Sequence, residues 1–381
     1  MKERNHIFIV YNGRFPSEQA HALFVAKTAE SLSLLSRNIT LLCIDRKKDT
    51  PKISAKQFFS LREEINIKYF PAPDFNRNKY LKKIFFHVSN VVFGFKIRRF
   101  LRKNYSVGDI VYTNDVNVIF FLKKYTVFFE LHDFPERFLW LYNYLFSIPQ
   151  KILVTNTWKE KRLHELFRET ISKTFVELNA VDLEKFNIQK TKQELRDVLG
   201  LDQSKKIVLY TGHLFGWKGA ETLAEAAELL SEVSFYFLGG KPHDVSSFKT
   251  KYSQFRNIHI LGYQQHELIP LWQKAADVLV LPNSGVSKIA RYYTSPMKLF
   301  EYIASRVPVV ASDLPSIREI VDETMVYFAE PDSSQSFAEA ITKALEDREQ
   351  TRRIAQAYEA VSSHTWRARA ERILEQLRTI S

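Results

Sequence analysis

The chain has 381 residues, of which 45% are hydrophobic and 26% are charged, and its formal net charge is +12. This is the composition of an ordinary soluble protein, long enough for two domains with substantial cores. The only cysteine, Cys43, lies in an apolar run and predicts an inert, buried strand thiol. A lone cysteine excludes a disulfide framework, which indicates a reducing compartment, and the positive charge suits an acidic partner.

The first residues lead directly into a short apolar strand at 6–10. No signal-peptide core and no membrane-spanning apolar run follows them. We therefore expect a protein that is made in the cytoplasm and stays there.

The first half of the chain alternates short apolar strands with amphipathic helices. Ser17 is expected to cap a helix that ends near Leu35. The predicted strands are 6–10, 39–44, 65–70, 109–112, 127–129, 152–154 and 175–178. This alternation predicts an α/β fold with a parallel sheet covered on both faces.

The same alternation restarts after a polar stretch at 189–193. The second set of predicted strands is 207–210, 235–238, 258–261, 278–281, 307–311 and 325–328. Two doubly wound sheets in tandem predict a ligand cleft at the carboxyl ends of the strands.

The stretch 294–304 carries the clearest functional pattern. Pro296 suits the first turn of a helix, and Ser295 or Thr294 can cap that turn. A helix start offers free N–H groups and a positive dipole end, and Lys298 adds a full charge that would suit a phosphate. Glu301 follows one turn later, where a carboxylate could accept bonds from ribose hydroxyls. The alternative is an ordinary amphipathic helix with its apolar face in the core.

A second candidate anion site follows the predicted strand 207–210. Gly212, Gly216 and Gly219 lie between this strand and the next helix, where glycines let the backbone approach a ligand. Lys218 supplies a positive charge. The spacing fits neither a Walker loop nor a dinucleotide fingerprint, and a plain strand-to-helix turn is the alternative.

These motifs closely resemble the C-terminal domain of GT-B glycosyltransferases, specifically the large retaining family 4. The matching segments occur in the family's order at 210–213, 217–219, 238–240, 261–263, 275–283, 295–304 and 307–312. The resemblance continues weakly into the first half, at 15–21 and 130–133. The segment 179–186 looks like the family's linker motif, with Ala180 where glycine is usual.

The resemblance implies two Rossmann-like domains facing each other across a cleft. The expected N-terminal, acceptor-side domain is 1–185 together with a crossover helix at 362–381, and the donor domain is 186–361. A UDP- or GDP-sugar would be the donor substrate, with no separate cofactor. The implied donor-binding residues are Gly13, Gly212, His213, Lys218, Ser295, Pro296, Met297, Lys298, Leu299 and Glu301.

The resemblance also implies catalytic roles for Lys218 at the diphosphate, Glu301 at the ribose and His132 near the anomeric carbon. His21 and Glu130 are candidate acceptor-side residues. His21 is expected on the first helix, where it could contact a phosphate-bearing acceptor. His132 could instead only satisfy a buried polar network, and Glu130 could serve only the structure of a strand end.

The chain departs from the family at one position. The family commonly has two acids eight positions apart, and here the first is Tyr293 while Glu301 matches the second. This departure puts the donor sugar and the detailed mechanism in question. The chain has no Asp-x-Asp pair, and its His and Cys residues are too scattered for a zinc site, so we expect no metal.

The segment 77–103 is basic and aromatic. It holds nine of the lysines and arginines and no acidic residue: Arg77, Lys79, Lys82, Lys83, Lys96, Arg98, Arg99, Arg102 and Lys103. Basic and apolar residues at helical spacing predict an amphipathic element on an anionic membrane surface, which would make the protein peripheral on the cytoplasmic face. A core-packed helix with a basic outer face is the alternative, and nucleic-acid binding lacks a recognised module.

The sequence therefore predicts a metal-independent, retaining glycosyltransferase that extends a lipid-linked glycan or surface polysaccharide. Two other functions stay open: a non-catalytic GT-B scaffold that binds nucleotide or glycan, and a nucleotide-sugar epimerase of the same architecture.

Overall fold

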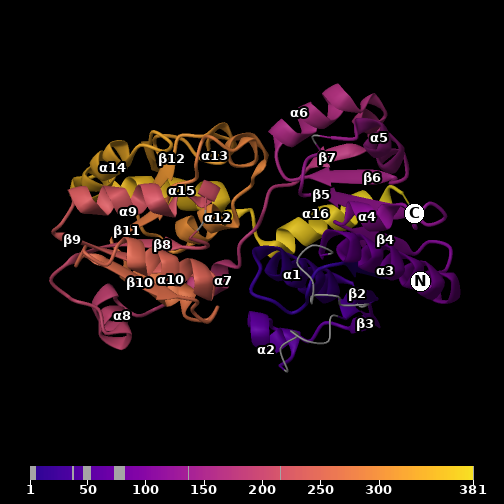
Figure 1. The fold of residues 1–381 in the computed structure, drawn as a ribbon, viewed down its shortest axis with the longest axis horizontal. Coiled ribbons are helices and arrows are strands. Elements are labelled where there is room, and N and C mark those ends of the chain that lie inside the picture. Colours follow the sequence, from indigo (N-terminus) through magenta and orange to yellow (C-terminus); the bar gives the residue numbers. More distant parts are fainter. Residues whose placement is uncertain are drawn as a thin grey trace. The chain divides into compact units, whose positions relative to one another are not determined.

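The chain folds into two compact units, seen in a computed structural model that describes residues 6–36, 38–45, 53–72, 82–135, 137–214 and 216–380, without the side chains of 82–86 (Figure 1). Unit 1 is Met1–Glu177 with Trp366–Ser381, and unit 2 is Leu178–Thr365. The boundaries expected from the sequence, at 185 and 362, differ by a few residues, because Val181 belongs to the core of unit 2 and Leu183 packs against it. Val181 also pairs with Thr365 in an isolated β-bridge.

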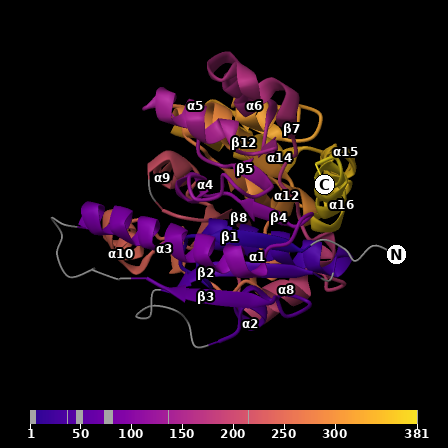
Figure 2. The same cartoon turned by 90° about the vertical axis from the view of Figure 1, so that its right-hand side faces the viewer.

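Unit 1 contains a seven-stranded parallel sheet in the order β3-β2-β1-β4-β5-β6-β7. Figure 2 shows β1, β2 and β3 beside one another. The strands are β1 (Ile7–Tyr11), β2 (Ile39–Asp45), β3 (Ile67–Pro71), β4 (Ile110–Thr113), β5 (Val127–Leu131), β6 (Lys151–Val154) and β7 (Thr174–Val176). Strands β1, β4 and β5 are buried along their whole length, as expected of a sheet covered on both faces.

The helices of unit 1 are α1 (Ala20–Leu35), α2 (Ala55–Phe59), α3 (Lys82–Asn104), α4 (Val116–Ile119), α5 (Leu139–Ser147), α6 (Thr157–Leu166), the 3-10 helix η1 (Arg168–Lys173) and α16 (Trp366–Arg378). The predicted cap at Ser17 is wrong. Helix α1 begins three residues later because Gln19 stays extended, and the Gln19 carbonyl accepts the first bonds from Ala22 and Leu23. Ser17 is instead fully buried.

Unit 2 contains a six-stranded parallel sheet in the order β10-β9-β8-β11-β12-β13. Its strands are β8 (Lys206–Thr211), β9 (Val233–Leu238), β10 (Ile258–Gly262), β11 (Val278–Leu281), β12 (Val309–Ser312) and β13 (Tyr327–Ala329). The order reverses beside β8, and in such sheets ligands bind at the carboxyl ends next to this reversal. The loop after β8 is therefore well placed for a ligand.

The helices of unit 2 are α7 (Leu183–Phe186), α8 (Lys192–Leu199), the 3-10 helix η2 (Gly216–Lys218), α9 (Ala220–Leu229), α10 (Pro242–Lys251), α11 (Ile269–Ala275), the π-helix η3 (Ile289–Tyr293), α12 (Met297–Ala304), α13 (Pro315–Arg318), α14 (Ser334–Glu346) and α15 (Gln350–Ser362). Two apolar clusters pack against the sheet, and the buried face of α12 belongs to one of them. No helix in the described ranges is long and apolar enough to cross a membrane.

The last helix, α16, packs against α1 and belongs to unit 1, although the whole of unit 2 separates it from the rest of unit 1 in the sequence (Figure 1). Two arginine–glutamate pairs fix it. Arg369 contacts Glu130 at 2.6 Å, and both side chains are buried. Arg372 donates two bonds to Glu177, at 2.6 and 2.7 Å. These contacts join the end of the chain to strand β5 and to the residue after β7.

Candidate functional site

In unit 2, hydrogen bonds join the end of β8 to helix α12. The Tyr302 hydroxyl accepts a bond from the Thr211 backbone N–H at 2.9 Å and lies 3.1 Å from the Thr211 hydroxyl. The Tyr210 hydroxyl donates to the carbonyl of His213 at 2.6 Å. The loop that begins at Gly212 is therefore held in a fixed position against the helix that carries Lys298 and Glu301.

Lys298 points into this loop. Its Nζ atom is buried, has no hydrogen-bond partner in the described part of the chain, and lies 4.4 Å from the centre of the Tyr210 ring. Burial, and then the nearby charge of Lys218, lower the pKa of Lys298 well below its usual range. A side chain at Gly212 would interfere, because a Cβ there would lie 2.7 Å from Lys298 Nζ, and φ at Gly212 is +141°.

Lys218 lies on the same loop, with Nζ 3.7 Å above the centre of the Trp217 ring. Burial lowers the pKa of Lys218 to about 8. The pKa of His213 is also lowered, first by burial and then by the charges of Lys218, Lys241 and Lys298. Within the described residues neither Lys218 nor Lys298 forms an ion pair, although the charge of Glu301 acts to raise the pKa of Lys298.

Glu301 lies one turn after Lys298 on α12. Burial raises the pKa of Glu301 to about 7, although Lys298, Lys185 and the side-chain amide of Gln273 act to lower it. Gln273 is fully buried on α11, and sequence reasoning missed it because a glutamine within an ordinary helix carries no motif. Glu301 can therefore accept bonds from ligand hydroxyls in a largely desolvated position.

The start of α12 differs from the sequence prediction. Pro296 is the cap residue rather than the first helical residue, and no side chain caps the helix. Ser295 bonds instead to Asn179, whose side-chain amide donates to the Ser295 carbonyl and whose backbone N–H donates to the Ser295 hydroxyl at 3.3 Å. The predicted cap at Ser295 is thus wrong, because Asn179 competes for that side chain.

Two further residues of this stretch were predicted to bind a donor. The Leu299 backbone N–H already donates to the Pro296 carbonyl at 2.9 Å, and the Leu299 side chain lies in the core. Met297 is the first helical residue, where backbone N–H groups lack an intrahelical partner. Met297 and Lys298 are therefore better placed than Leu299 to offer N–H groups to an anion.

Unit 1 brings the other predicted residues together at the carboxyl end of its sheet. Glu130 is fully buried on β5, accepts a bond from the Tyr112 hydroxyl, and pairs with Arg369. His132 Nε2 lies 3.1 Å from Glu130 Oε1. The pKa of Glu130 is lowered to about 2: burial acts to raise it, and the Arg369 charge, His132 and the Tyr112 bond outweigh that effect. Glu130 is thus an ionised group that supports His132.

His21 lies at the start of α1, beside His132. The two imidazole rings are 4.9 Å apart, and His21 Nε2 lies 2.7 Å from Asn114 Nδ2. Burial, and then His132, lower the pKa of His21 to about 3. His21 is therefore neutral at physiological pH and suits a hydrogen bond rather than an ion pair with a phosphate.

Gly13 follows β1 in unit 1. A Cβ at Gly13 would lie 2.1 Å from the Tyr11 hydroxyl, so the Tyr11 side chain folds back over it. Lys159, which the sequence did not single out, is buried on α6. It donates hydrogen bonds to Thr155 Oγ1 at 2.8 Å and to the Leu131 carbonyl at 3.3 Å. Burial lowers the pKa of Lys159 to about 8. It holds the loop that begins at His132.

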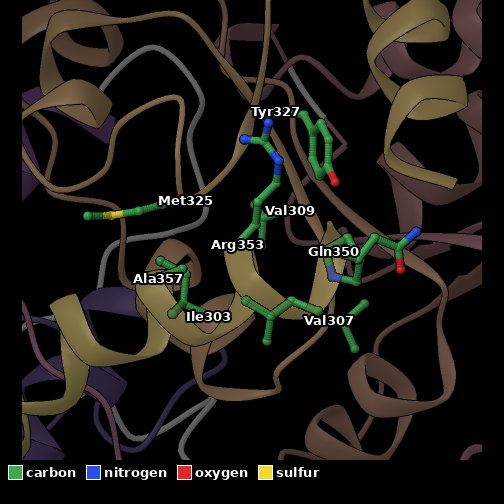
Figure 3. A pocket seen from close by; sticks show the side chains of 10 residues that line it. Ile303, Val307, Val309, Met325, Tyr327, Gln350, Arg353 and Ala357 are labelled. Carbon is green, nitrogen blue, oxygen red and sulfur yellow. The ribbon is translucent and has the colours of Figure 1, made fainter. Parts of the chain in front are cut away.

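A cavity elsewhere in unit 2 is too small for a substrate (Figure 3). It has room for about 10 Å³ and is lined by Ile303, Val307, Tyr327 and Arg353 among others. That is about the space that one water molecule needs. Ile303 lies on the core face of α12, so this cavity does not belong to the group of Lys298 and Glu301.

Comparison with known sequences agrees with this geometry. Residues 191–360 match the family described as Glycosyl transferases group 1. Over 156 residues the chain is 30% identical to a Bacillus subtilis (strain 168) protein named "Putative teichuronic acid biosynthesis glycosyltransferase TuaC". The matched stretch covers 41% of this chain and 37% of the length of that relative.

Solved structures resemble the fold over almost the whole chain. Sucrose-phosphate synthase from Thermosynechococcus elongatus superposes with a TM-score of 0.81 at 17% identity, covering 99% of each chain. HepE of Anabaena, solved with UDP and glucose, superposes with a TM-score of 0.76 at 18% identity, covering 98% of this chain and 100% of that one.

Two parallel Rossmann-like sheets and these neighbours define a GT-B fold, and the fold predicted from the sequence is confirmed. The chain has the GT-B fold, and the part of it that matches the model of Glycosyl transferases group 1 lies within unit 2. The narrower assignment to retaining family 4 stays a prediction.

Proposed function

We propose that the chain is a glycosyltransferase that moves a sugar from a nucleotide-sugar donor to a glycan or lipid-linked acceptor. The observation that supports this most is the pair of lysines on the loop after β8 and on α12: Lys298 Nζ is buried beside Gly212, Lys218 is half-buried, and neither forms an ion pair within the described residues. Neighbouring cations that are partly desolvated repel each other and are costly unless an anion neutralises them. A diphosphate is an anion of the right charge, and the start of α12 adds N–H donors to it.

We propose a UDP-sugar as the donor, with a GDP-sugar as the second choice. The neighbour HepE has been solved with UDP-glucose. Glu301 would accept bonds from the ribose hydroxyls, one helical turn from the phosphate contact of Lys298. Gln273 would orient the Glu301 carboxyl from α11.

In the proposed reaction, the bond between the sugar's anomeric carbon and the diphosphate oxygen breaks, the acceptor hydroxyl oxygen bonds to that carbon, and the hydroxyl proton passes to the leaving diphosphate. Negative charge grows on the leaving diphosphate, where Lys218 and Lys298 stabilise it. These groups can do so without a metal ion. Retention of the anomeric configuration rests on the family resemblance.

In unit 1, His132 is the residue we propose to lie near the donor sugar, with its orientation fixed by Glu130. The burial of Glu130 and its pair with Arg369 favour this supporting role over direct contact with an acceptor. His21 stays an acceptor-side candidate, as a neutral hydrogen-bonding group.

We further propose a place in surface polysaccharide or lipopolysaccharide biosynthesis, with the protein peripheral on the cytoplasmic face of the membrane. The relative TuaC is named for teichuronic acid biosynthesis, and the neighbour WaaG is described as involved in lipopolysaccharide biosynthesis. Part of the predicted membrane segment, 77–81, lies outside the described residues. Helix α3 covers the rest and buries one face, including Phe93, Ile97 and Leu101.

The outer face of α3 is basic and partly apolar. Arg98, Arg99, Arg102 and Lys103 are exposed, and Phe95 is 58% exposed. Further exposed apolar side chains follow on α5 and its cap: Phe138 is 68% exposed and Trp140 is 75% exposed. Exposed aromatic residues with basic neighbours are typical of a membrane-surface element. Core packing and membrane contact therefore use different faces of one helix.

The test begins with a panel of UDP- and GDP-sugars, screened by thermal shift on the full chain. We expect one donor to raise the melting temperature and then to be slowly hydrolysed, and Lys298→Ala to abolish both effects. Lys249→Ala, a change at an exposed lysine of unit 2, is the matched control.

The outcomes separate the alternatives. Binding with neither hydrolysis of the donor nor transfer to any acceptor in a crude glycan fraction would indicate a scaffold. Conversion of the donor to its epimer would indicate an epimerase. No shift with any nucleotide or nucleotide sugar would contradict the proposal.

A further inference from the structure

Unit 1 contains a group of side-chain amides that the family motifs do not include. Asn12 directly follows β1, and its Nδ2 donates to Asn90 Oδ1 on α3 at 2.9 Å. Asn114 directly follows β4, beside His21. Strands β1 and β4 are neighbours, with Val10 opposite Thr113, so Asn12 and Asn114 emerge from adjacent strand ends. Side chains at this edge of a parallel sheet are placed to meet a ligand.

The amides keep unused hydrogen-bonding capacity. Asn90 is only 3% exposed, and its Nδ2 has no partner among the described residues. The same holds for two buried acceptor atoms, Asn12 Oδ1 and Asn114 Oδ1. Buried polar atoms are nearly always satisfied in folded proteins, so three at one sheet edge indicate a ligand that brings both donors and acceptors.

Two arginines on this side of unit 1 are already paired within the described residues. Arg14 bonds to Glu18 on the loop after β1, and Arg369 bonds to Glu130. His21 is neutral because its pKa is lowered to about 3. The chemistry therefore differs from that of unit 2, where two lysines form no ion pair within the described residues, and it disfavours a phosphate or carboxylate ligand.

We propose that Asn12, Asn90 and Asn114 form a binding site for the hydroxyl groups of a neutral sugar, the acceptor end of the glycan. An amide presents a donor and an acceptor together, as a sugar hydroxyl does, so each amide can exchange two bonds with the ligand. The inference rests on the proposed function and narrows it: the acceptor would be read by uncharged sugar hydroxyls rather than by a phosphate-bearing group.

The test uses ligand-observed NMR on the full chain with four probes: methyl β-D-glucoside, N-acetylglucosamine, glucose 6-phosphate and inorganic phosphate. We expect a neutral sugar to bind and inorganic phosphate not to compete with it. Asn90→Ala and Asn114→Ala should each weaken sugar binding about fivefold, the effect of one lost hydrogen bond. Asn104→Ala, on the exposed side of α3, is the matched control and should change nothing.

Asn90→Asp adds a sharper comparison, because it keeps the acceptor toward Asn12 but removes the Nδ2 donor; it should also lose sugar binding. Asn114 is only half-buried, so Asn114→Ala still decides the matter if the Asn90 variants fail to fold. Sugar binding that is unchanged in Asn114→Ala, or competition by phosphate, would overturn the inference.

The binding of UDP, measured in parallel, keeps the two proposals apart. If UDP binds but the asparagine substitutions do not change sugar binding, the proposed amide site is overturned and the proposed donor site is unaffected. Amide-dependent sugar binding without any nucleotide binding would support the amide site and contradict the donor proposal.

Discussion

Lys218 and Lys298 show how a single side chain can be kept ready for an anion. Both have a lowered pKa because burial removes the water that would stabilise their charge. Each packs against an aromatic ring, Trp217 or Tyr210, which offsets part of that cost. A bound diphosphate would raise the pKa of both lysines and so favour their charged forms. The free-energy cost of holding these two partly desolvated lysines without an anion would therefore favour the binding of a diphosphate.

Lys218→Ala should weaken the binding of UDP much more than that of uridine. The lost contact is to the diphosphate, and a charged hydrogen bond contributes about 1.5–3 kcal/mol. Calorimetry with both ligands checks this, with Lys205→Ala as the control, since Lys205 pairs with Glu232 at the surface. Equal losses for UDP and uridine would point to misfolding or to another role.

The affinity for UDP should fall as the pH rises above 8. The pKa of Lys218 is about 8 in the free protein and would rise beside a diphosphate, so binding takes up a proton at higher pH. We expect a loss approaching tenfold per pH unit there. Calorimetry at pH 7, 8 and 9 measures it, and Lys218→Ala should flatten the profile. A flat profile in the unmodified protein would contradict the assignment.

Glu301→Gln should weaken UDP binding but stabilise the free protein at pH 8. The folded pKa of about 7 is above the usual value of 4.5, so the folded state holds the proton more tightly. Stability therefore falls as the pH rises from 4.5 to 7, and the penalty, up to about 3 kcal/mol, is complete above 7. Urea unfolding at pH 4.5 and 8 should show a gain for Glu301→Gln only at pH 8.

Helix α16 shows what one element contributes. It carries Arg369 to the buried carboxylate of Glu130, which in turn lies beside His132. A buried ion pair adds little net stability by itself, but breaking it leaves an uncompensated charge. The Glu130 side chain therefore contacts both Arg369 of the last helix and His132, the candidate catalytic histidine.

Arg369→Met should destabilise unit 1 by about 3–5 kcal/mol, because Glu130 would stay buried without its partner. The double change Glu130→Gln with Arg369→Met should recover much of this loss. Urea unfolding measures both. Arg367→Met is the control: Arg367 is 79% exposed and pairs only with Glu371, so its loss should cost under about 1 kcal/mol. A loss for Arg369→Met no larger than this would refute the argument.

The elements differ in how far the sequence predicts them. The loop after β8 and the helix at 297–304 are recognisable because glycines, a proline and charges have fixed local spacing. Asn179, Gln273 and Arg369 could not be found this way, because each acts on a residue distant in the sequence: Ser295, Glu301 and Glu130. The wrong cap at Ser295 has the same origin, since a local rule was overridden by the distant Asn179.

The net charge of +12 on the whole molecule favours binding to an anionic surface, which the proposed donor site does not explain. The exposed basic residues of α3 contribute to it, and the aromatic side chains near them are unusually exposed for a folded domain. Near an anionic leaflet each such charge contributes about 1 kcal/mol. Reversible attachment through this face is therefore energetically reasonable.

Vesicle sedimentation should show binding to anionic but not to neutral lipid, and high salt should weaken it. Reversing Arg98, Arg99, Arg102 and Lys103 to glutamate should release the protein, while donor hydrolysis persists. Reversing Lys206, Lys249, Lys343 and Arg352, which are exposed in unit 2, makes the same change in net charge and should leave binding nearly intact. Equal release by both sets would show that total charge, not this face, is responsible.

The discontinuity of unit 1 has a consequence for synthesis on the ribosome. Unit 2 is one continuous stretch, Leu178–Thr365, and can close as soon as it emerges. Unit 1 begins first yet must wait for Arg369 and Arg372, so during translation the carboxylates of Glu130 and Glu177 lack their arginines. Chains truncated before residue 366 and released from the ribosome should therefore be cleaved by protease in unit 1 and protected in unit 2.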